Sequence, residues 1–218
     1  MSIKLGTQSI KMPYAKVYLG SNKVYEGSAY TLVDYITSVS DKYFDTGIKI
    51  KSNTKIELEA TYVPTTTHYF GAFGVKGSTP TIYVNANSNY LRITYGANQQ
   101  NKSLMSNGSN ISPDDRFLLV ADNTMYQVKN KSTTPETTVQ YTPSTTNTST
   151  DTINMLVLGY NYRGSPRGSR SNDIKLYGCK IYESGSLVAY FQPAKDSNNI
   201  ECLYESVSDS LIYAQQVE

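Results

Sequence analysis

Tryptophan is absent from this chain of 218 residues, and histidine occurs only once. A histidine-based catalytic triad would therefore depend on His68 alone, and no nucleophile-elbow sequence accompanies the many serines. Long apolar runs are missing too: none approaches the roughly 20 residues that a membrane-spanning helix needs, and residues 1–8 lack the apolar core of a signal peptide. We therefore expect a protein that is made in a cytoplasm without a signal peptide and is not inserted into a membrane.

A strong charge of either sign is also missing, because 20 lysines and arginines nearly balance 18 aspartates and glutamates. The net charge of +2 gives no electrostatic reason to bind nucleic acid or an anionic membrane. Phosphate-binding loops, EF-hand spacing and redox dithiol motifs are absent as well. The sequence thus predicts no nucleic-acid partner, no cofactor and no metal.

Cysteine is scarce, with only Cys179 and Cys202. Two residues at this spacing form neither a disulfide framework nor a zinc-ligand motif. Because free cysteine is among the residues most often buried, we expect two reduced thiols packed in the core. A disulfide between the last strands stays open as the alternative in an oxidising exterior.

Tyrosine is abundant, with 20 residues against five phenylalanines, and threonine, serine and asparagine are frequent. Aromatic and β-branched residues favour half-buried pleated surfaces, so this composition favours strands over helices. A chain of this length can bury a sizeable core, and all-β sandwiches of this size are commonly one domain. We expect one main all-β domain.

Strand-like runs alternate with turn signals from residue 30 onward. The runs cover residues 43–47, 55–60, 69–73, 81–84, 90–95, 117–121, 125–128 and 155–159. In the second of them Ile56, Leu58 and Ala60 face one way and the residues between them face the other, because side chains alternate along a strand. One face of this strand should lie in the core and the other in solvent.

The stretch from Ile174 to Tyr204 combines several strand and turn signals. A strand-like run ends at residues 183–186, which have turn chemistry, and a second run starts at Leu187. Because proline cannot donate to a sheet, we expect Pro193 to end the second run. The prediction is a β-hairpin.

This stretch resembles the closing hairpin of LamG-like, concanavalin A-like jelly-roll domains, especially those of bacteriophage virion proteins. In that group a run of the form KIY-x-x-G-x-LV-x-x-F-x-P precedes D…LY-[DE]-x-V. The matching residues here are Lys180, Ile181, Tyr182, Gly185, Leu187, Val188, Phe191, Pro193, Asp196, Leu203, Tyr204, Glu205 and Val207. Residues 43–47 and 53–57 are similar to the opening of the same domains, which typically reads QYIDTG…NT-x-[IV]-E.

The resemblance covers residues 30 to 213 and implies a concanavalin A-like (LamG-like) jelly-roll sandwich of two antiparallel sheets. It also implies a non-enzymatic structural protein on the virion surface, either a head fibre or a tail-associated protein. Other virion proteins are then the expected partners, and host-surface glycans are a candidate ligand. Such proteins commonly form symmetric oligomers that protect edge strands, so we expect a homo-oligomer, most simply a trimer.

The alternative functions are a bacterial carbohydrate-binding module and, less favoured, a glycoside hydrolase of the concanavalin A-like superfamily, and a calcium site stays open beside any of them. A bacterial carbohydrate-binding module would normally arrive with an export signal or a fused enzyme, and this chain shows neither. Some LamG-type domains bind calcium at a loop rim, and Asp114 and Asp115, which follow a proline in a turn-like context, could take that role here.

The first 28 residues differ from the rest and contain two short strand-like runs around Gly20-Ser21-Asn22, which predicts a hairpin. A lone hairpin cannot bury enough area to be stable, so it should pair with its own domain or with another protein. We therefore divide the chain into a segment 1–28 and a jelly-roll domain 29–218. The candidate attachment residues to the particle are Val17, Tyr18, Leu19, Val24 and Tyr25. An extra edge hairpin on the sandwich is the alternative.

Catalysis is disfavoured because the carboxylates do not match a glycosidase. Glycoside hydrolysis usually needs two carboxyl groups roughly 5 to 10 Å apart on opposite sides of the bond. Glu57 and Glu59, two apart on one strand face, superficially fit this requirement. The related glycosidases carry acidic residues at three alternating strand positions, and here the third is Thr61. Their sugar subsites usually include tryptophan, which is absent. We expect no enzyme.

Binding is chemically more plausible than catalysis in residues 160–170, which look like a loop. The candidate ligand-contacting residues are Tyr160, Tyr162, Arg163, Arg167 and Arg170. Guanidinium groups and tyrosine rings suit acidic sugars or a carboxylate-bearing partner through bidentate hydrogen bonds and stacking. A solvated loop whose charges aid solubility or touch a neighbouring subunit is the alternative.

Residues 132–152, rich in Thr and Ser, predict an exposed insertion or an irregular edge hairpin.

Overall fold

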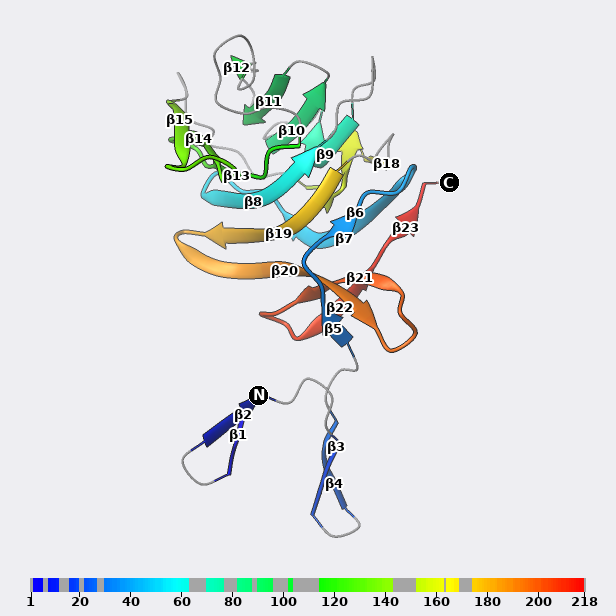
Figure 1. Cartoon of the computed structure of the whole chain (residues 1–218). Coiled ribbons are helices and arrows are strands. Elements are labelled where there is room, and N and C mark those ends of the chain that lie inside the picture. The colour runs from blue at the N-terminus through cyan, green and yellow to red at the C-terminus, as the bar shows by residue number, and fades with distance from the viewer. Residues whose placement is uncertain are drawn as a thin grey trace.

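The computed structural model contains strands and no helix in the residues that it describes (Figure 1). It describes side chains over residues 30–61, 114–140, 142, 152–162, 164–168 and 174–217. It describes only the backbone of residues 62 and 141 and of the strands within 2–26, 70–76, 82–95 and 102–103. His68 lies outside the described residues. The prediction of an all-β chain is confirmed.

A ten-stranded antiparallel sheet forms one layer. Its main strands, in spatial order, are β15 (Thr137–Tyr141), β14 (Tyr126–Asn130), β13 (Phe117–Ala121), β8 (Thr54–Tyr62), β19 (Ile174–Glu183), β20 (Ser186–Asp196), β21 (Glu201–Glu205) and β22 (Ser210–Tyr213). Two short strands add to it: β5 (Tyr30–Leu32) pairs with β20, and β6 (Ile36–Thr37) pairs with β19.

A nine-stranded sheet forms the second layer. Its main strands are β12 (Lys102–Ser103), β11 (Tyr90–Tyr95), β10 (Ile82–Asn87), β9 (Phe70–Lys76), β16 (Asn154–Val157), β7 (Lys42–Lys49) and β23 (Gln215–Gln216). A hairpin of β17 (Gly159–Tyr162) and β18 (Ser165–Gly168) joins it through a parallel pairing of β17 with β9, whereas its other pairings are antiparallel. The two sheets give the chain the architecture of a β-sandwich.

The core is built by alternation along the strands. On β8, Ile56, Leu58 and Ala60 are each at most 1% exposed, as their spacing predicts. The buried cluster gathers side chains of both sheets: Ile36, Phe44, Ile50, Ile56, Leu58, Ala60, Phe117, Leu119, Ala121, Tyr126, Val128, Met155, Val157, Leu158, Ile174, Leu176, Cys179, Ile181, Ala189, Phe191 and Leu203. Each large aliphatic side chain in it contributes about 1.5–3 kcal/mol of burial free energy, so this cluster holds the two layers together.

The predicted closing hairpin is confirmed as β19 and β20. Its turn uses left-handed backbone at Ser184 (φ 49°) and Gly185 (φ 81°), which glycine adopts without strain. The expectation that Pro193 ends the second strand is wrong, because β20 continues to Asp196. At this point the neighbour of β20 changes from β19 to β5, and the Pro193 carbonyl accepts a hydrogen bond from the Val33 N–H at 3.0 Å. The missing proline N–H therefore falls where one partner strand has ended and the next begins.

Cys179 and Cys202 are both free and buried, which confirms the expectation of two packed thiols. Cys179 lies on β19 and Cys202 on β21, with β20 between them. Strands two apart are separated by roughly 10 Å, beyond the Cα distance of about 7 Å that a disulfide can span. The alternative of a disulfide between them is wrong for this fold.

Two hairpins precede the sandwich. β3 (Lys16–Leu19) pairs with β4 (Asn22–Glu26), which confirms the predicted hairpin, with a register shift after Val17. β1 (Ser2–Leu5) and β2 (Gln8–Lys11) form another that the sequence analysis missed. Among the described strands, neither hairpin is hydrogen-bonded to the two large sheets. Within the Thr-rich stretch, β15 pairs in regular register with β14, so the edge-hairpin interpretation is confirmed there, whereas residues 143–151 lie outside the described ones.

Candidate functional site

Tyrosine and charged side chains gather on the outer face of the ten-stranded sheet. On β19 the residues Ile174, Leu176 and Ile181 point into the core, whereas Tyr177 and Tyr182 are only half-buried. A bulge between Leu176 and Gly178 shifts the register with β8 at this point. We call the surface formed by Tyr35, Tyr177, Tyr182 and Tyr190, with the charged groups beside them, the tyrosine face.

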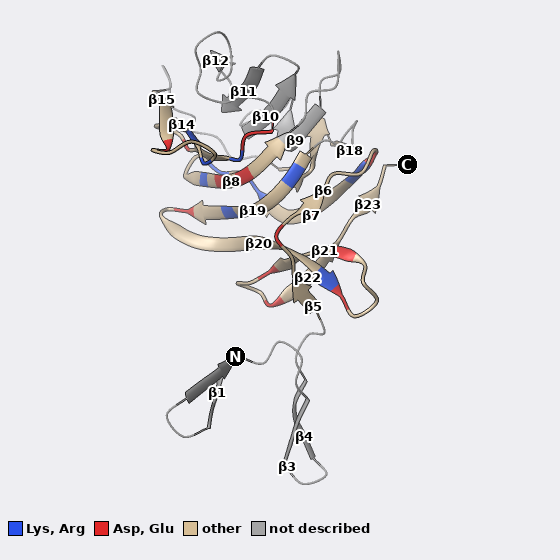
Figure 2. Ribbon diagram, viewed as in Figure 1, with Lys and Arg blue, Asp and Glu red and all other residues tan. Residues whose placement is uncertain are grey.

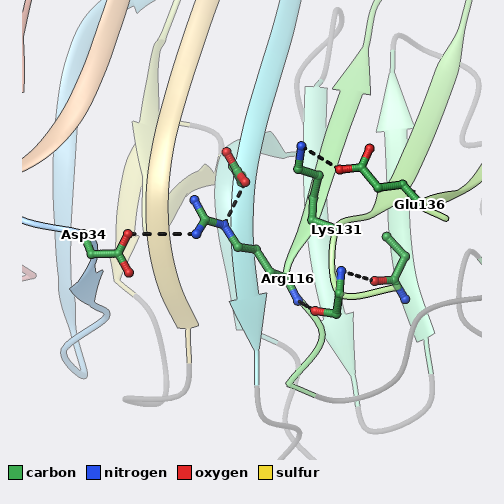
Figure 3. A network of polar contacts seen from close by, with 7 residues as sticks. Asp34, Arg116, Lys131 and Glu136 are labelled. Carbon is green, nitrogen blue, oxygen red and sulfur yellow. Dashed lines mark hydrogen bonds and ion pairs between the residues drawn. The ribbon is translucent and has the colours of Figure 1, made fainter. Parts of the chain in front are cut away.

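Arg116 organises one part of this face (Figure 3). Its Nε donates a hydrogen bond to Oε1 of Glu59 at 2.8 Å, and its Nη1 lies 3.9 Å from Oδ1 of Asp34. The guanidinium carbon lies 3.8 Å from the ring centroid of Tyr177, which in turn is 5.8 Å from the ring of Tyr35. The charge of Glu59 is therefore matched by a cation that also covers an aromatic ring.

Glu57 is engaged by Lys55 of its own strand and by Tyr182, which lies opposite Lys55 on the neighbouring strand β19. Lys55 Nζ lies 2.7 Å from Oε1 of Glu57, and the hydroxyl of Tyr182 donates to Oε2 at 3.1 Å. The same ammonium lies 4.2 Å from the ring centroid of Tyr182. Burial and then the charge of Glu57 raise the pKa of Tyr182 above its ordinary value, so this hydroxyl stays protonated and remains a donor.

The two glutamates of β8 on this face are therefore already engaged by other side chains. Both oxygens of Glu57 and one oxygen of Glu59 are occupied by partners. Thr61, at the third alternating position, is 6% exposed.

Two lysines of β19 have a different environment from these paired charges. Lys175 Nζ lies 4.9 Å from the ring centroid of Tyr35, and Lys180 Nζ lies 4.9 Å from that of Tyr190. Within the described part of the chain neither has a carboxylate in ion-pair distance. The Tyr190 ring lies against Gly178, because a Cβ there would be 3.4 Å from its Cε2.

The arginine-containing segment predicted as a loop is partly a hairpin, which corrects that expectation. Tyr160 and Tyr162 lie on β17, and Arg167 lies on β18 directly opposite Tyr160. The parallel pairing of β17 with β9 orders a segment whose glycine-rich composition looked irregular. Arg163 and Arg170 lie outside the described residues. The structure therefore brings Tyr160 and Arg167 together, with Arg167 and Tyr162 exposed, and does not place the other two arginines.

The acidic residues of the C-terminal motif stabilise turns. Asp196 Oδ1 accepts hydrogen bonds from the N–H groups of Asn198 and Ile200, both at 2.9 Å, and its Oδ2 accepts one from the Tyr213 hydroxyl at 3.0 Å. Led by the hydrogen bond from Ile200, these contacts hold the pKa of Asp196 below its ordinary value. These bonds occupy both oxygens, so the motif supports the fold at this position.

The remaining predicted sites give no cluster of ligands. Asp115 accepts a hydrogen bond from Asn130 at 2.8 Å, and no group of three or more potential metal-ligating side chains occurs in the described part of the chain. In the N-terminal segment, Val17 lies opposite Tyr25, and Tyr18, Leu19 and Val24 lie on the same two strands. Their side chains lie outside the described residues, so their role as an attachment surface stays a prediction.

A surface hollow of about 290 Å³ is a further candidate. It is lined by Thr37, Val39, Lys42, Phe44, Leu158, Ile200, Glu201, Tyr213 and Ala214. Leu158 adopts φ 55°, which is unusual for a leucine. The polar residues of the hollow are Thr37, Lys42, Glu201 and Tyr213, and the Tyr213 hydroxyl already donates to Asp196. The tyrosine face gathers more charged and aromatic side chains.

The tyrosine face was missed from the sequence, although a signal for it exists. Lys175-Leu-Tyr177 and Lys180-Ile-Tyr182 repeat the same lysine–apolar–tyrosine pattern, which places the charged and aromatic groups on one face of a strand. Tyr35, by contrast, comes from the connection before β6, and its position depends on the pairing of β6 with β19.

A scan against models of known protein families finds no match to this chain, and a search among curated proteins finds none either. In the described residues, no helix is long and apolar enough to cross a membrane. The function therefore has to be inferred from the residues and the fold.

Proposed function

We propose that this chain is a non-enzymatic structural protein of a tailed-phage virion, either a head fibre or a tail-associated surface protein. The observation that supports it best is the position of the two segments that resemble phage jelly-roll domains. They lie far apart in sequence, yet β8 of the first pairs with β19 of the second from Thr54–Glu183 to Tyr62–Ile174. Residues 54–57 and 180–183, which carry part of the resemblance, are thus neighbours in one sheet, whereas residues 43–47 lie on β7 in the other sheet.

The finer fold in this proposal is the concanavalin A-like jelly roll. Two large sheets, a core between them and a C-terminal hairpin at the centre of one sheet agree with it. Other sandwiches share these features, so the fold supports the function by analogy only. In this proposal residues 1–28 attach to other virion proteins, and the sandwich faces outward.

The non-enzymatic part of the proposal is supported by the engaged glutamates. Each carboxylate of β8 on the tyrosine face already has a cationic partner, and the third alternating position holds the buried Thr61 instead of an acidic residue. The tyrosines of the same face favour one second candidate, a carbohydrate-binding module, because aromatic rings combined with polar groups are common at sugar-contacting surfaces. The two functions share a binding surface and differ in what the N-terminal segment attaches to.

Particle association tests the proposal directly. Purified particles would be analysed by mass spectrometry for the intact chain and for a variant lacking residues 1–28, both supplied during particle assembly. We expect the intact chain to be in the particles and the shortened chain to be soluble and absent from them. Circular dichroism of the shortened chain controls for folding. Absence of the intact chain from the particles would contradict the proposal, and equal incorporation of both would contradict the assigned attachment segment.

Oligomerisation is part of the same proposal. The edge strand β15 ends the ten-stranded sheet, and symmetric assembly is a common way to protect such edges. We expect a trimer in light scattering of the purified chain, and a monomer would contradict this expectation.

A further inference from the structure

The tyrosine face carries two lysines, Lys175 and Lys180, that form no ion pair with a carboxylate in the described part of the chain, although Lys180 stands directly opposite Glu57 in the strand register. The two glutamates on β8 are each paired with a cation. Lys175 and Lys180 contact only tyrosine rings, at 4.9 Å each, and no described carboxylate lies in ion-pair distance of them. An ammonium that rests on a ring keeps its N–H donors available. The charge complement of this surface is therefore an anion.

The spacing of the two lysines indicates an extended ligand. They stand five residues apart on β19, with one bulge between them, which places their Cα atoms roughly 15 Å apart at the usual rise of a strand. Figure 2 shows their charges at two separate points of β19. A small anion or a single sugar cannot reach both, whereas a polymer with repeated anionic groups can.

The aromatic rings indicate what lies between these charges. Tyr177 stands between the two lysines in the sequence and is half-buried, and the Arg116 guanidinium covers one face of its ring at 3.8 Å, so a sugar can reach only the remaining part of the side chain. Tyr35, whose ring lies beside Lys175, is 39% exposed. The Tyr190 ring lies beside Lys180 and against Gly178. A tyrosine has an apolar ring for packing against the flat face of a sugar and a hydroxyl for a hydrogen bond. Along β19 the order is Lys175, Tyr177, Lys180 and Tyr182, with Tyr35 and Tyr190 beside the lysines from neighbouring segments, an arrangement that suits an acidic sugar chain.

We propose that the tyrosine face binds an extended acidic polysaccharide along β19. Its anionic groups contact Lys175 and Lys180, and its sugar rings pack against Tyr35, Tyr177 and Tyr190. This inference deepens the proposed function, on which it rests for its biological setting, by naming the ligand class. It also places the ligand on the sheet and away from the β17–β18 hairpin.

Affinity electrophoresis of the full purified chain at about 0.1 M salt, where charges are screened beyond about 10 Å, tests the proposal. The probes are polygalacturonate, hyaluronate and dextran sulfate, with fully methyl-esterified polygalacturonate as the uncharged match of the first. The test variant is Lys175→Gln/Lys180→Gln. The control variant, Lys42→Gln/Lys49→Gln, removes the same charge from two exposed lysines on β7, in the other sheet.

We expect the native chain to bind at least one acidic probe and to bind esterified polygalacturonate at least tenfold more weakly than polygalacturonate. Loss of two charge-assisted contacts should weaken binding of the acidic probe by about tenfold or more in the test variant, with the control variant within twofold of the native chain. Tyr35→Ala, in a connection outside the core, should weaken binding several-fold without changing the circular dichroism spectrum.

Three results would overturn the proposal. The first is no binding to any of the three acidic probes. The second is equal binding by native chain and test variant, or equal losses in test and control variants, because either shows that the charge of β19 is not specifically used. The third is a changed oligomeric state of the test variant in light scattering, which would show that a second copy covers this face. None of these depends on incorporation into particles, so the proposed function is tested separately.

Discussion

Glu205 is expected to be the most important single carboxylate for the stability of the sandwich. It is 5% exposed and accepts hydrogen bonds from the backbone N–H groups of Tyr190 at 2.8 Å, Val207 at 2.9 Å and Ser208 at 2.6 Å. It thereby joins β20 to the turn that follows β21. Glu205→Gln removes the charge and replaces one acceptor oxygen by an NH₂ group that cannot accept these bonds.

The size of the effect follows from these contacts. Hydrogen bonds to a charged group contribute about 1.5–3 kcal/mol each, and a donor left unpaired costs a similar amount unless water replaces the partner. The turn is open to water, since Val207 is 52% exposed. We therefore expect Glu205→Gln to lower the free energy of unfolding by about 2–4 kcal/mol at pH 7, out of the 5–15 kcal/mol typical of a domain.

The same contacts predict how this loss depends on pH. Burial by itself raises the pKa of Glu205, but the hydrogen bonds from Ser208, Tyr190 and Val207 outweigh it and hold the pKa below its ordinary value. A carboxyl with a lowered folded-state pKa stabilises the fold above its unfolded pKa of about 4.3, and this stabilisation is lost as pH falls through the folded pKa. The difference between native chain and Glu205→Gln should therefore narrow in acid.

Urea unfolding followed by tyrosine fluorescence measures both effects, since the chain has 20 tyrosines and no tryptophan. Glu201→Gln is the matched control, because it makes the same change at an exposed position of β21. We expect the control to stay within about 0.5 kcal/mol of the native chain. Equal stabilities of the native chain and Glu205→Gln at pH 7, or a difference that does not change between pH 7 and pH 3, would refute the reasoning.

Three further predictions concern the core, the β17–β18 hairpin and the tyrosine face. Burial raises the pKa of Cys179 to about 12 and that of Cys202 to about 11, so neither should react with a thiol reagent at pH 8 until the chain is unfolded; rapid labelling of the native chain would contradict this. Gly168→Ala makes the new Cβ clash with the backbone of Asp41 in the turn before β7 and should lower the free energy of unfolding in urea by about 1–3 kcal/mol. A Cβ added at Gly164 meets no atom within 4 Å, so Gly164→Ala should lower the free energy of unfolding by only about 1 kcal/mol, through its left-handed φ. Equal losses in the two variants would contradict the predicted clash at Gly168. Arg116→Gln should cost about 1 kcal/mol through its lost ion pair and ring contact, and no change would show that these contacts are not stabilising.

Local patterns predicted much of the ten-stranded sheet. The two-residue alternation of β8 correctly placed Ile56 and Leu58 in the core, and Ser184-Gly185 correctly marked the turn between β19 and β20. These features depend on residues close in the sequence, where side-chain alternation and turn chemistry apply.

Features that depend on distant pairings could not be read in the same way. Pro193 lies inside a strand because β5 reaches that part of β20 from the start of the domain. Tyr160 and Arg167 lie on strands because β17 pairs with β9, which no local signal indicates. Tyr35 joins the tyrosine face through the pairing of β6 with β19. Each misplaced or missed residue owes its position to a contact formed far along the chain.

The central claim is that the tyrosine face binds sugar polymers and does not cleave them. Incubation of the purified chain with polygalacturonate, hyaluronate and dextran sulfate, followed by measurement of both retained polymer and newly formed reducing ends, tests it most directly. The account predicts retention of at least one polymer with no increase in reducing ends. Release of reducing ends by the native chain, and its loss in Glu57→Gln, would contradict it.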